Sequence, residues 1–168
     1  MRIHRPVGRW LGVVARMHQM YMARQLEPMG IGMGQYPFLL SICETPGIRQ
    51  DNLADALYLN KSSVARALTQ LEQNGFLTRT VDPADRRAYC IHPTRRAREI
   101  RGEIVRLSRE SVSHLTRALS EEEQNIFASL LERVYLSCTE MPPPTPDADT
   151  KAPGIGSPLN TIKGDFHE

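Results

Sequence analysis

The stretch NKSSVARALTQLEQNGFLTRTVDPADRRAYCIHP, residues 60–93, determines the fold that we expect for this chain. Asn60 is a favourable N-cap residue and Gly75 a favourable terminator, so a helix is expected between them. Apolar residues at i, i+4 and i+7 define the buried side of that helix: Val64, Leu68 and Leu71.

The residues after this helix predict a β-hairpin. Two short alternating runs, 77–81 and 88–92, lie on either side of the turn-forming sequence DPAD at 82–85. Pro93 follows the second run. Because proline has no N–H to donate to a strand ladder, we expect the second strand to end at His92.

Three helices are predicted before residues 60–93. Apolar residues at helical spacing indicate a first helix over about 8–27, which the glycines of GIGMG at 30–34 interrupt. A second helix begins near Gln35, with Pro37 tolerated in its first turn. A short third helix covers 50–58, with three residues facing inward: Leu53, Ala54 and Leu57.

Two long helices are predicted after the hairpin. Thr94 is positioned to cap a fifth helix, and SEEE at 120–123 is a capping box that opens a sixth. The fold class is therefore mainly α. Within residues 35–93, the order of three helices followed by a hairpin is typical of the lobe of a winged helix-turn-helix, and long helices flank it over about 8–27 and 94–138.

Composition divides the chain into a body, 1–140, and a tail, 141–168. The tail holds six of the twelve prolines, so we expect it to be extended or disordered. No stretch approaches the ~18 apolar residues needed to cross a membrane. The N-terminal residues lack the apolar run of a secretory signal. Three scattered cysteines suit a reducing cytosol, so we expect a cytoplasmic protein.

Charge is concentrated in the middle of the chain. Residues 49–109 carry 12 basic against 7 acidic side chains, and 18 of the 21 basic residues in the chain are arginines. The planar guanidinium matches phosphate and guanine edges, although a solvated arginine-rich surface has the same composition.

The polar side of the helix after Asn60 offers chemistry suited to DNA. On a helical wheel Ser62, Arg66, Thr69 and Gln73 lie opposite the apolar residues, with Ser63 and Gln70 beside them. Hydroxyls and backbone N–H groups at a helix start can bind phosphates, and a mid-helix arginine can reach guanine O6 and N7. The paired arginines Arg86 and Arg87 at the hairpin tip suit a narrow minor groove.

The chain resembles the MarR family of bacterial transcriptional regulators, which are winged-helix homodimers. The resemblance rests on GQYPFLL at 34–40, NLADAL at 52–57, NKSSVARALTQLEQNGFLTR at 60–79 and DPADRRAY at 82–89. It implies pairing through the first and last two helices, binding of a palindromic operator on double-stranded DNA, and release by a small effector. The expected function is a sequence-specific regulator, in particular a repressor.

The resemblance also implies site residues. Ser62, Ser63 and Arg66 would contact bases, and Arg87 would enter the minor groove, oriented by an ion pair with Asp85. The full set expected at DNA is Asn60, Lys61, Ser62, Ser63, Arg66, Gln70, Asp85, Arg86 and Arg87. One departure is Arg49, which stands where the family usually has a Ser or Thr capping the third helix.

The resemblance implies an effector pocket between the first two helices, the fifth helix and the DNA-binding lobe. His18, Tyr21, Tyr36 and Phe38 are candidates to line it around an aromatic or phenolic ligand, although ordinary packing accounts for each of them more simply. Cys43 lies on an apolar face and suits the core, and no cysteine precedes it where some relatives sense oxidants.

Other functions remain to be weighed. GIGMG lacks the preceding strand and following Lys of a phosphate loop, and no catalytic motif is found, so we expect neither an enzyme nor a cofactor. A winged helix that binds only proteins would use the same arginines on an acidic partner. A metal-responsive regulator would use Cys90 and His92, which are too few ligands for a metal site by themselves, and a redox-responsive regulator is a further alternative.

The last helix predicts a homodimer. It carries an apolar face broader than one lobe can cover, made of Ile126, Phe127, Leu130, Leu131, Val134 and Tyr135. Two-fold pairing would present two recognition helices to successive major grooves.

Overall fold

The computed structural model describes residues 6–139, and these form a winged helix-turn-helix with long flanking helices, as expected. The predicted tail, 141–168, lies outside the described residues. The elements are α1 (Val7–Leu26), the 3-10 turn η1 (Glu27–Met29), α2 (Tyr36–Glu44), β1 (Ile48–Arg49), α3 (Gln50–Ala56), α4 (Lys61–Gln73), β2 (Leu77–Val81), β3 (Tyr89–Pro93), α5 (Arg95–Thr116) and α6 (Glu121–Thr139).

One hydrophobic core joins the lobe to the long helices. The predicted inward residues of α3 and α4 are buried, and they pack with Phe76 and Ile91 of the hairpin. Met22 and Leu26 at the end of α1, and Ile104 and Leu107 of α5, belong to the same core. Removal of this apolar surface from water is the main term that fixes α4 against the rest of the lobe.

The helix starts confirm the predicted capping residues. The Asn60 side chain accepts a hydrogen bond from the Ser63 N–H at 2.8 Å, and Thr94 accepts from the Ala97 N–H at 3.4 Å. At α6 the capping box closes in both directions, because the Ser120 N–H donates to Glu123 and the Glu123 N–H donates to the Ser120 hydroxyl.

The sheet differs from the expected strand pair because it has a third strand. β1 pairs with β3 through Ile48 with Ile91 and Arg49 with Cys90, in the strand order β1-β3-β2. The Gly47 N–H donates to the Ile91 carbonyl at 2.8 Å, with a φ of 86° that favours glycine. Two residues are too few to show a period, so this strand exists only through its long-range partner.

The expected end of the second hairpin strand was also wrong. β3 runs to Pro93, which pairs with Leu77, rather than ending at His92. The next residue, Thr94, donates its N–H to the Phe76 carbonyl at 3.0 Å. Hydrogen-bonded and non-hydrogen-bonded pairs alternate in an antiparallel ladder, so Pro93 occupies a position that requires no N–H.

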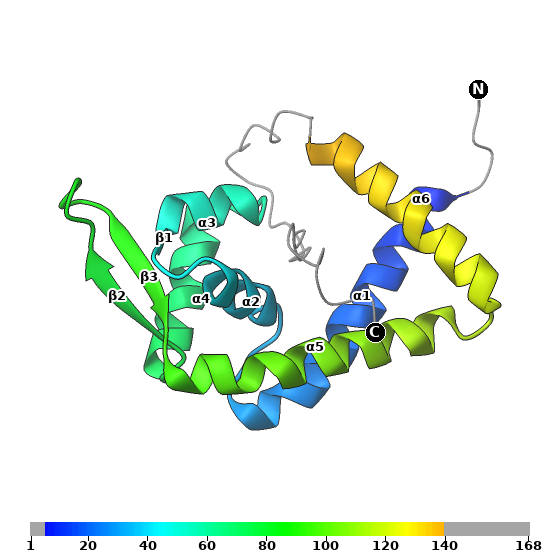
Figure 1. Cartoon of the computed structure of the whole chain (residues 1–168), viewed down its shortest axis with the longest axis horizontal. Helices are drawn as coiled ribbons and strands as arrows, with labels where there is room; N and C mark the ends of the chain where they lie inside the picture. Colours follow the sequence, from blue (N-terminus) through cyan, green and yellow to red (C-terminus); the bar gives the residue numbers. More distant parts are fainter. Residues whose placement is uncertain (1–5, 140–168) are drawn as a thin grey trace.

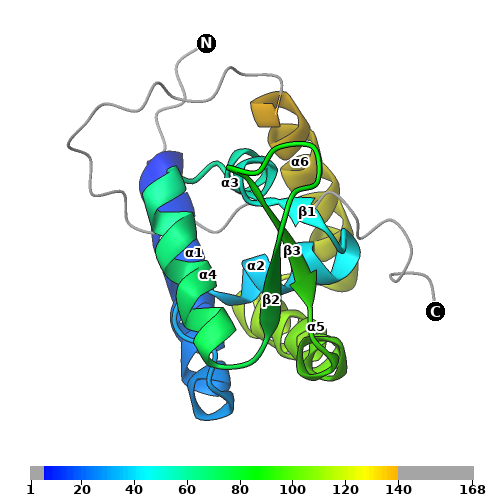
Figure 2. The ribbon, with the colours of Figure 1, turned by 90° about the vertical axis from the view of Figure 1, so that its left-hand side faces the viewer.

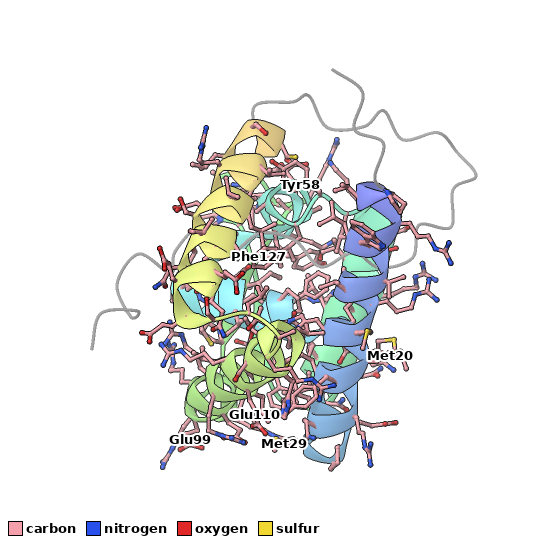
Figure 3. The ribbon with its side chains drawn as sticks, turned by 90° about the vertical axis from the view of Figure 1, so that its right-hand side faces the viewer. Met20, Met29, Tyr58, Glu99, Glu110 and Phe127 are labelled. Carbon is pink, nitrogen blue, oxygen red and sulfur yellow. The ribbon has the colours of Figure 1, made fainter. Side chains whose placement is uncertain are left out.

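The long helices separate the two ends of the molecule. α5 runs from the β2–β3 hairpin at one end to α6 at the other, with α1 crossing beside it (Figure 1). α4 and the hairpin lie side by side on one end face (Figure 2). α1 and α6 form the opposite end face (Figure 3). Within residues 6–139, no helix combines the length and apolar character needed to span a membrane.

Candidate nucleic-acid interface

The outward side of α4 is polar and exposed. Its buried residues Val64, Leu68 and Leu71 are 0% exposed, which fixes the helix rotation. The rotation leaves five predicted polar residues exposed: Ser62, Arg66, Thr69, Gln70 and Gln73. Ser63 is half-buried at the first turn.

The start of α4 is held by its own side chains. Asn60 Oδ1 accepts from the Ser63 N–H and from the Ser62 hydroxyl, both at 2.8 Å. Lys61 Nζ lies 3.1 Å from Asp51 Oδ1 on α3, an exposed pair that contributes little to stability. Asn60 therefore holds the helix start, and Lys61 and Ser62 remain exposed in its first turn.

Arg66 and Gln70, the two long candidate residues on α4, differ in how they are held. Arg66 Nη2 donates to Ser63 Oγ at 3.4 Å, a long bond that a better acceptor readily replaces. Gln70 Oε1 accepts from the buried Gln35 Nε2 at 2.9 Å. Gln70 is thus tied to the α1–α2 connection, where Gln35 also accepts from the Gly32 N–H.

The hairpin is attached to α4 by a residue that the sequence did not single out. Arg79 on β2 donates from Nη2 to Thr69 Oγ1 at 2.9 Å, and its Nε lies 3.3 Å from Glu72 Oε2. Thr69, predicted on the recognition side, is therefore engaged with the hairpin. The available signal was an arginine in register with the buried Leu77 on the strand that follows α4, which does not identify a partner.

The hairpin tip has a different ion-pair arrangement from the expected one. Asp85 makes no ion pair with Arg87 among the described residues. Its Oδ1 accepts from the Arg87 N–H at 3.0 Å, and its Oδ2 lies 3.3 Å from Arg49 Nη2. Arg86 and Arg87 are both exposed. Asp85 therefore orders the backbone at Arg87 and leaves the guanidinium unpaired.

The far end of α4 is anchored to the long helices. Arg96 of α5 donates to the Asn74 carbonyl at 2.6 Å and to the Met29 carbonyl at 3.0 Å, and its guanidinium lies 4.3 Å from the Phe76 ring centre. Asn74 Nδ2 donates to the Gly30 carbonyl at 2.8 Å. The recognition helix thus ends on the segment that joins α1 to α2.

Two of the four candidate effector residues touch each other. His18 Nε2 lies 2.9 Å from the Tyr36 hydroxyl, and its Nδ1 lies 2.9 Å from the hydroxyl of Ser111, so α1, α2 and α5 meet there. Burial lowers the pKa of His18 and raises that of Tyr36 to about 12. Both groups are therefore neutral near pH 7 and act as hydrogen-bond partners.

The other two candidates are placed differently. Tyr21 lies one turn along α1, with its ring centre 5.8 Å from that of His114 on α5. Burial and a hydrogen bond with Glu110 raise the pKa of the Tyr21 hydroxyl. Phe38 is buried in the core and does not join the polar group around His18.

The cysteines form no common site. Cys43 is half-buried and packs against the core, and burial raises the pKa of its thiol, which disfavours the reactive thiolate. Cys90 is half-buried on β3 and Cys138 is exposed on α6. Within residues 6–139, no three or more His, Cys, Asp or Glu side chains are grouped so that they could hold a metal ion.

The fold defines a winged helix-turn-helix protein, and comparison with known proteins gives its family. The MarR family model matches residues 31–89. The chain is 32% identical, over 113 residues, to a proposed transcriptional regulatory protein for the hcr operon of Thauera aromatica, covering 67% of this chain and 68% of that protein. The chain belongs to the MarR family of transcriptional regulators, whose relatives are regulators and not enzymes.

Solved structures show the same fold. A MarR crystal structure is 32% identical with a TM-score of 0.78, over 84% of this chain and 96% of that one. A MarR-family regulator from Listeria monocytogenes, crystallised with a 26mer DNA, is 24% identical with a TM-score of 0.72, over 81% and 91% of the two chains.

Proposed function

We propose that the chain binds double-stranded DNA sequence-specifically, with α4 in the major groove and the hairpin tip in the adjacent minor groove. The observation that carries the proposal is the placement of Arg66 and Arg87. Both are exposed, neither is committed to an ion pair among the described residues, and they belong to neighbouring elements of one face (Figure 2). The Listeria relative crystallised with DNA supports a role of this fold at DNA.

The contacts at DNA divide between two kinds of residue. Ser62, Ser63, Arg66 and Gln70 face the base edges, with Arg66 able to bind a guanine through two hydrogen bonds. Lys61, Arg86 and Arg87 supply positive charge to the backbone and minor groove. Asn60 and Asp85 act indirectly, because their oxygens hold the backbone of the helix start and of the hairpin tip.

We further propose that two copies pair through α1 and α6, the helices that form the end face opposite the hairpin (Figure 3). Both helices expose large apolar side chains: Trp10, Leu11, Val14 and Met17 on α1, and Ile126, Phe127, Leu130, Leu131 and Val134 on α6. Five of them come from the predicted apolar face of α6, whose sixth member, Tyr135, is half-buried. Residues 35–93 then form one DNA-binding lobe on each side of a two-fold axis.

Regulation is proposed to act at the His18 group. A repressor released by a small aromatic or phenolic effector needs a polar site at the junction between the pairing helices and the lobe. His18, Tyr36 and Ser111 come from α1, α2 and α5 and supply hydroxyl and imidazole groups there. A ligand that replaces these hydrogen bonds changes how α2 is held against α1 and α5, and so the angle between the two lobes.

The experiment is fluorescence anisotropy with a selected palindromic duplex and a scrambled one at two salt concentrations. Arg66→Ala should reduce discrimination between them by about 1–3 kcal/mol, because one bidentate guanine contact is lost. Arg87→Ala should weaken binding to both duplexes more evenly. It should also reduce the slope of log affinity against log salt concentration by about one. Arg95→Ala is the matched control, since Arg95 is exposed and pairs with Glu99 on its own helix.

Three outcomes would contradict this assignment. Absence of salt-dependent binding to either duplex would favour a winged helix that binds only proteins. Full discrimination in Arg66→Ala combined with its loss in Arg87→Ala would reverse the groove assignment. A stable monomer at micromolar concentration in light scattering would overturn the pairing.

A further inference from the structure

The base of the hairpin loop carries two carboxylates that face one arginine from another strand. Arg49 on β1 lies with Nη1 3.3 Å from Asp82 Oδ2 and with Nη2 3.3 Å from Asp85 Oδ2. The Arg49 side chain is 37% exposed, and that of Asp82 is 10% exposed. One guanidinium therefore connects the first strand of the sheet to both ends of the turn between β2 and β3.

The two oxygens of each carboxylate have different tasks. Asp82 Oδ1 accepts from the Ala84 N–H at 2.8 Å, and Asp85 Oδ1 accepts from the Arg87 N–H at 3.0 Å, so these oxygens shape the loop backbone. The Oδ2 atoms are directed to Arg49. Local hydrogen bonds thus set the shape of the loop, and Arg49 sets where the loop lies relative to the sheet.

Arg49 also compensates charge close to the proposed DNA contacts. Asp82 and Asp85 stand within a few residues of Arg86 and Arg87, on the element assigned to the minor groove. Two uncompensated carboxylates at this place would repel the phosphates that the arginines attract. Arg49 occupies the N-cap position of α3 but makes no side-chain cap bond there. Its guanidinium is directed to the two aspartates instead.

We propose that Arg49 is a positioning residue for DNA binding, which holds the hairpin in place and neutralises Asp82 and Asp85 without touching DNA itself. This inference rests on the proposed DNA-binding function. It predicts that Arg49 acts through the two aspartates, so its effect should disappear when their charges are removed.

The test is a mutant cycle on the full chain. Arg49→Ala is compared with Asp82→Asn/Asp85→Asn and with the triple variant, and Arg95→Ala is the control for loss of an arginine. Asparagine keeps an oxygen for the Ala84 and Arg87 N–H groups while it removes the charge. Each variant is titrated by anisotropy against the selected duplex with A·T or with G·C pairs beneath the hairpin, and its thermal unfolding is recorded.

Arg49→Ala should bind the selected duplex about two- to thirtyfold more weakly, the range that two partly exposed ion pairs supply. It should lose preference for A·T pairs under the hairpin, as is also expected of Arg87→Ala, and keep the discrimination due to α4. In the double-asparagine background Arg49→Ala should have no further effect. Arg49→Lys should recover part of the affinity, since an ammonium supplies charge but not a two-pronged contact.

Each of four other results would contradict the proposed role of Arg49. Wild-type protein that binds no duplex would remove the proposed function, and with it the basis of this inference. Wild-type binding with Arg49→Ala equal to Arg95→Ala would overturn the inference alone. An equal loss in the double-asparagine background would show that Arg49 meets a phosphate directly. Loss of α4 discrimination together with a lower unfolding temperature would show a structural role only.

Discussion

Arg96 joins three parts of the molecule at the end of the recognition helix, and its removal should lower stability measurably. The substitution Arg96→Ala removes the donors to the Asn74 and Met29 carbonyls and the guanidinium over the Phe76 ring. The neighbouring Arg95→Ala is a matched control. Arg95 lies on the same turn of α5 but pairs with Glu99 on its own helix, and its side chain is 92% exposed.

The magnitude follows from these three contacts. Each hydrogen bond from an exposed guanidinium to a carbonyl contributes about 0.5–1 kcal/mol net, because water can replace the donor. The contact with the Phe76 ring adds about 0.5–1 kcal/mol. The expected loss is about 2 kcal/mol, and Arg95→Ala should be close to wild type because an exposed i,i+4 pair contributes little.

Urea unfolding at one fixed protein concentration measures this difference. With a slope of about 2 kcal/mol per M, Arg96→Ala should lower the midpoint by about 1 M. Arg96→Lys should lie between wild type and Arg96→Ala, because one ammonium cannot serve both carbonyls and cover the ring. Equal midpoints for Arg96→Ala and Arg95→Ala would refute the argument and show that water replaces the three contacts without cost.

Two further predictions concern the long helices. Burial lowers the pKa of His18 below 6.5, so the unfolded chain binds the proton at higher pH than the folded chain does. The neutral imidazole therefore contributes to the free energy of unfolding above pH 6.5, and this contribution is lost as the pH falls through the folded pKa. The decrease in the urea midpoint between about pH 7.5 and 5.5 should therefore be smaller for His18→Gln than for wild type. An equal decrease in both proteins would exclude His18 as a cause of the pH dependence. Leu130→Glu places a charge on a side chain that is 52% exposed, so it should give a monomer by light scattering with unchanged helical circular dichroism. A dimer in this variant would remove α6 from the pairing surface.

Local signals allowed most of the fold to be predicted. The caps at Asn60 and Thr94 and the capping box at Ser120 depend on residues within one turn, so their sequence pattern is sufficient. The buried stripe of α4 was predicted for the same reason, because helical periodicity places residues on one side whatever they pack against. The strand β1 was missed because it is two residues long and depends on β3.

The contacts that position the candidate site could not be predicted, since they join residues far apart in the chain. Arg49 meets Asp85 across 36 residues, and Arg96 meets Met29 across 67. An arginine in the sequence indicates a donor but not its acceptor. The ion pair expected between Asp85 and Arg87 was wrong for this reason, because the sequence neighbour competes with a partner that only the fold brings close.

The two ends of α1 have different environments, and the exposed end makes the proposed pairing depend on the concentration of the chain. Met22 and Leu26 lie in the core, whereas Trp10 and Met17 are exposed and are assigned to the pairing surface. Pairing is bimolecular, so below its dissociation constant the amount of paired protein rises with the square of chain concentration. If two copies pair as proposed, occupancy of an operator with two half-sites would rise more steeply than in proportion to the cellular level of the chain. A modest change in expression would then move such an operator between free and occupied.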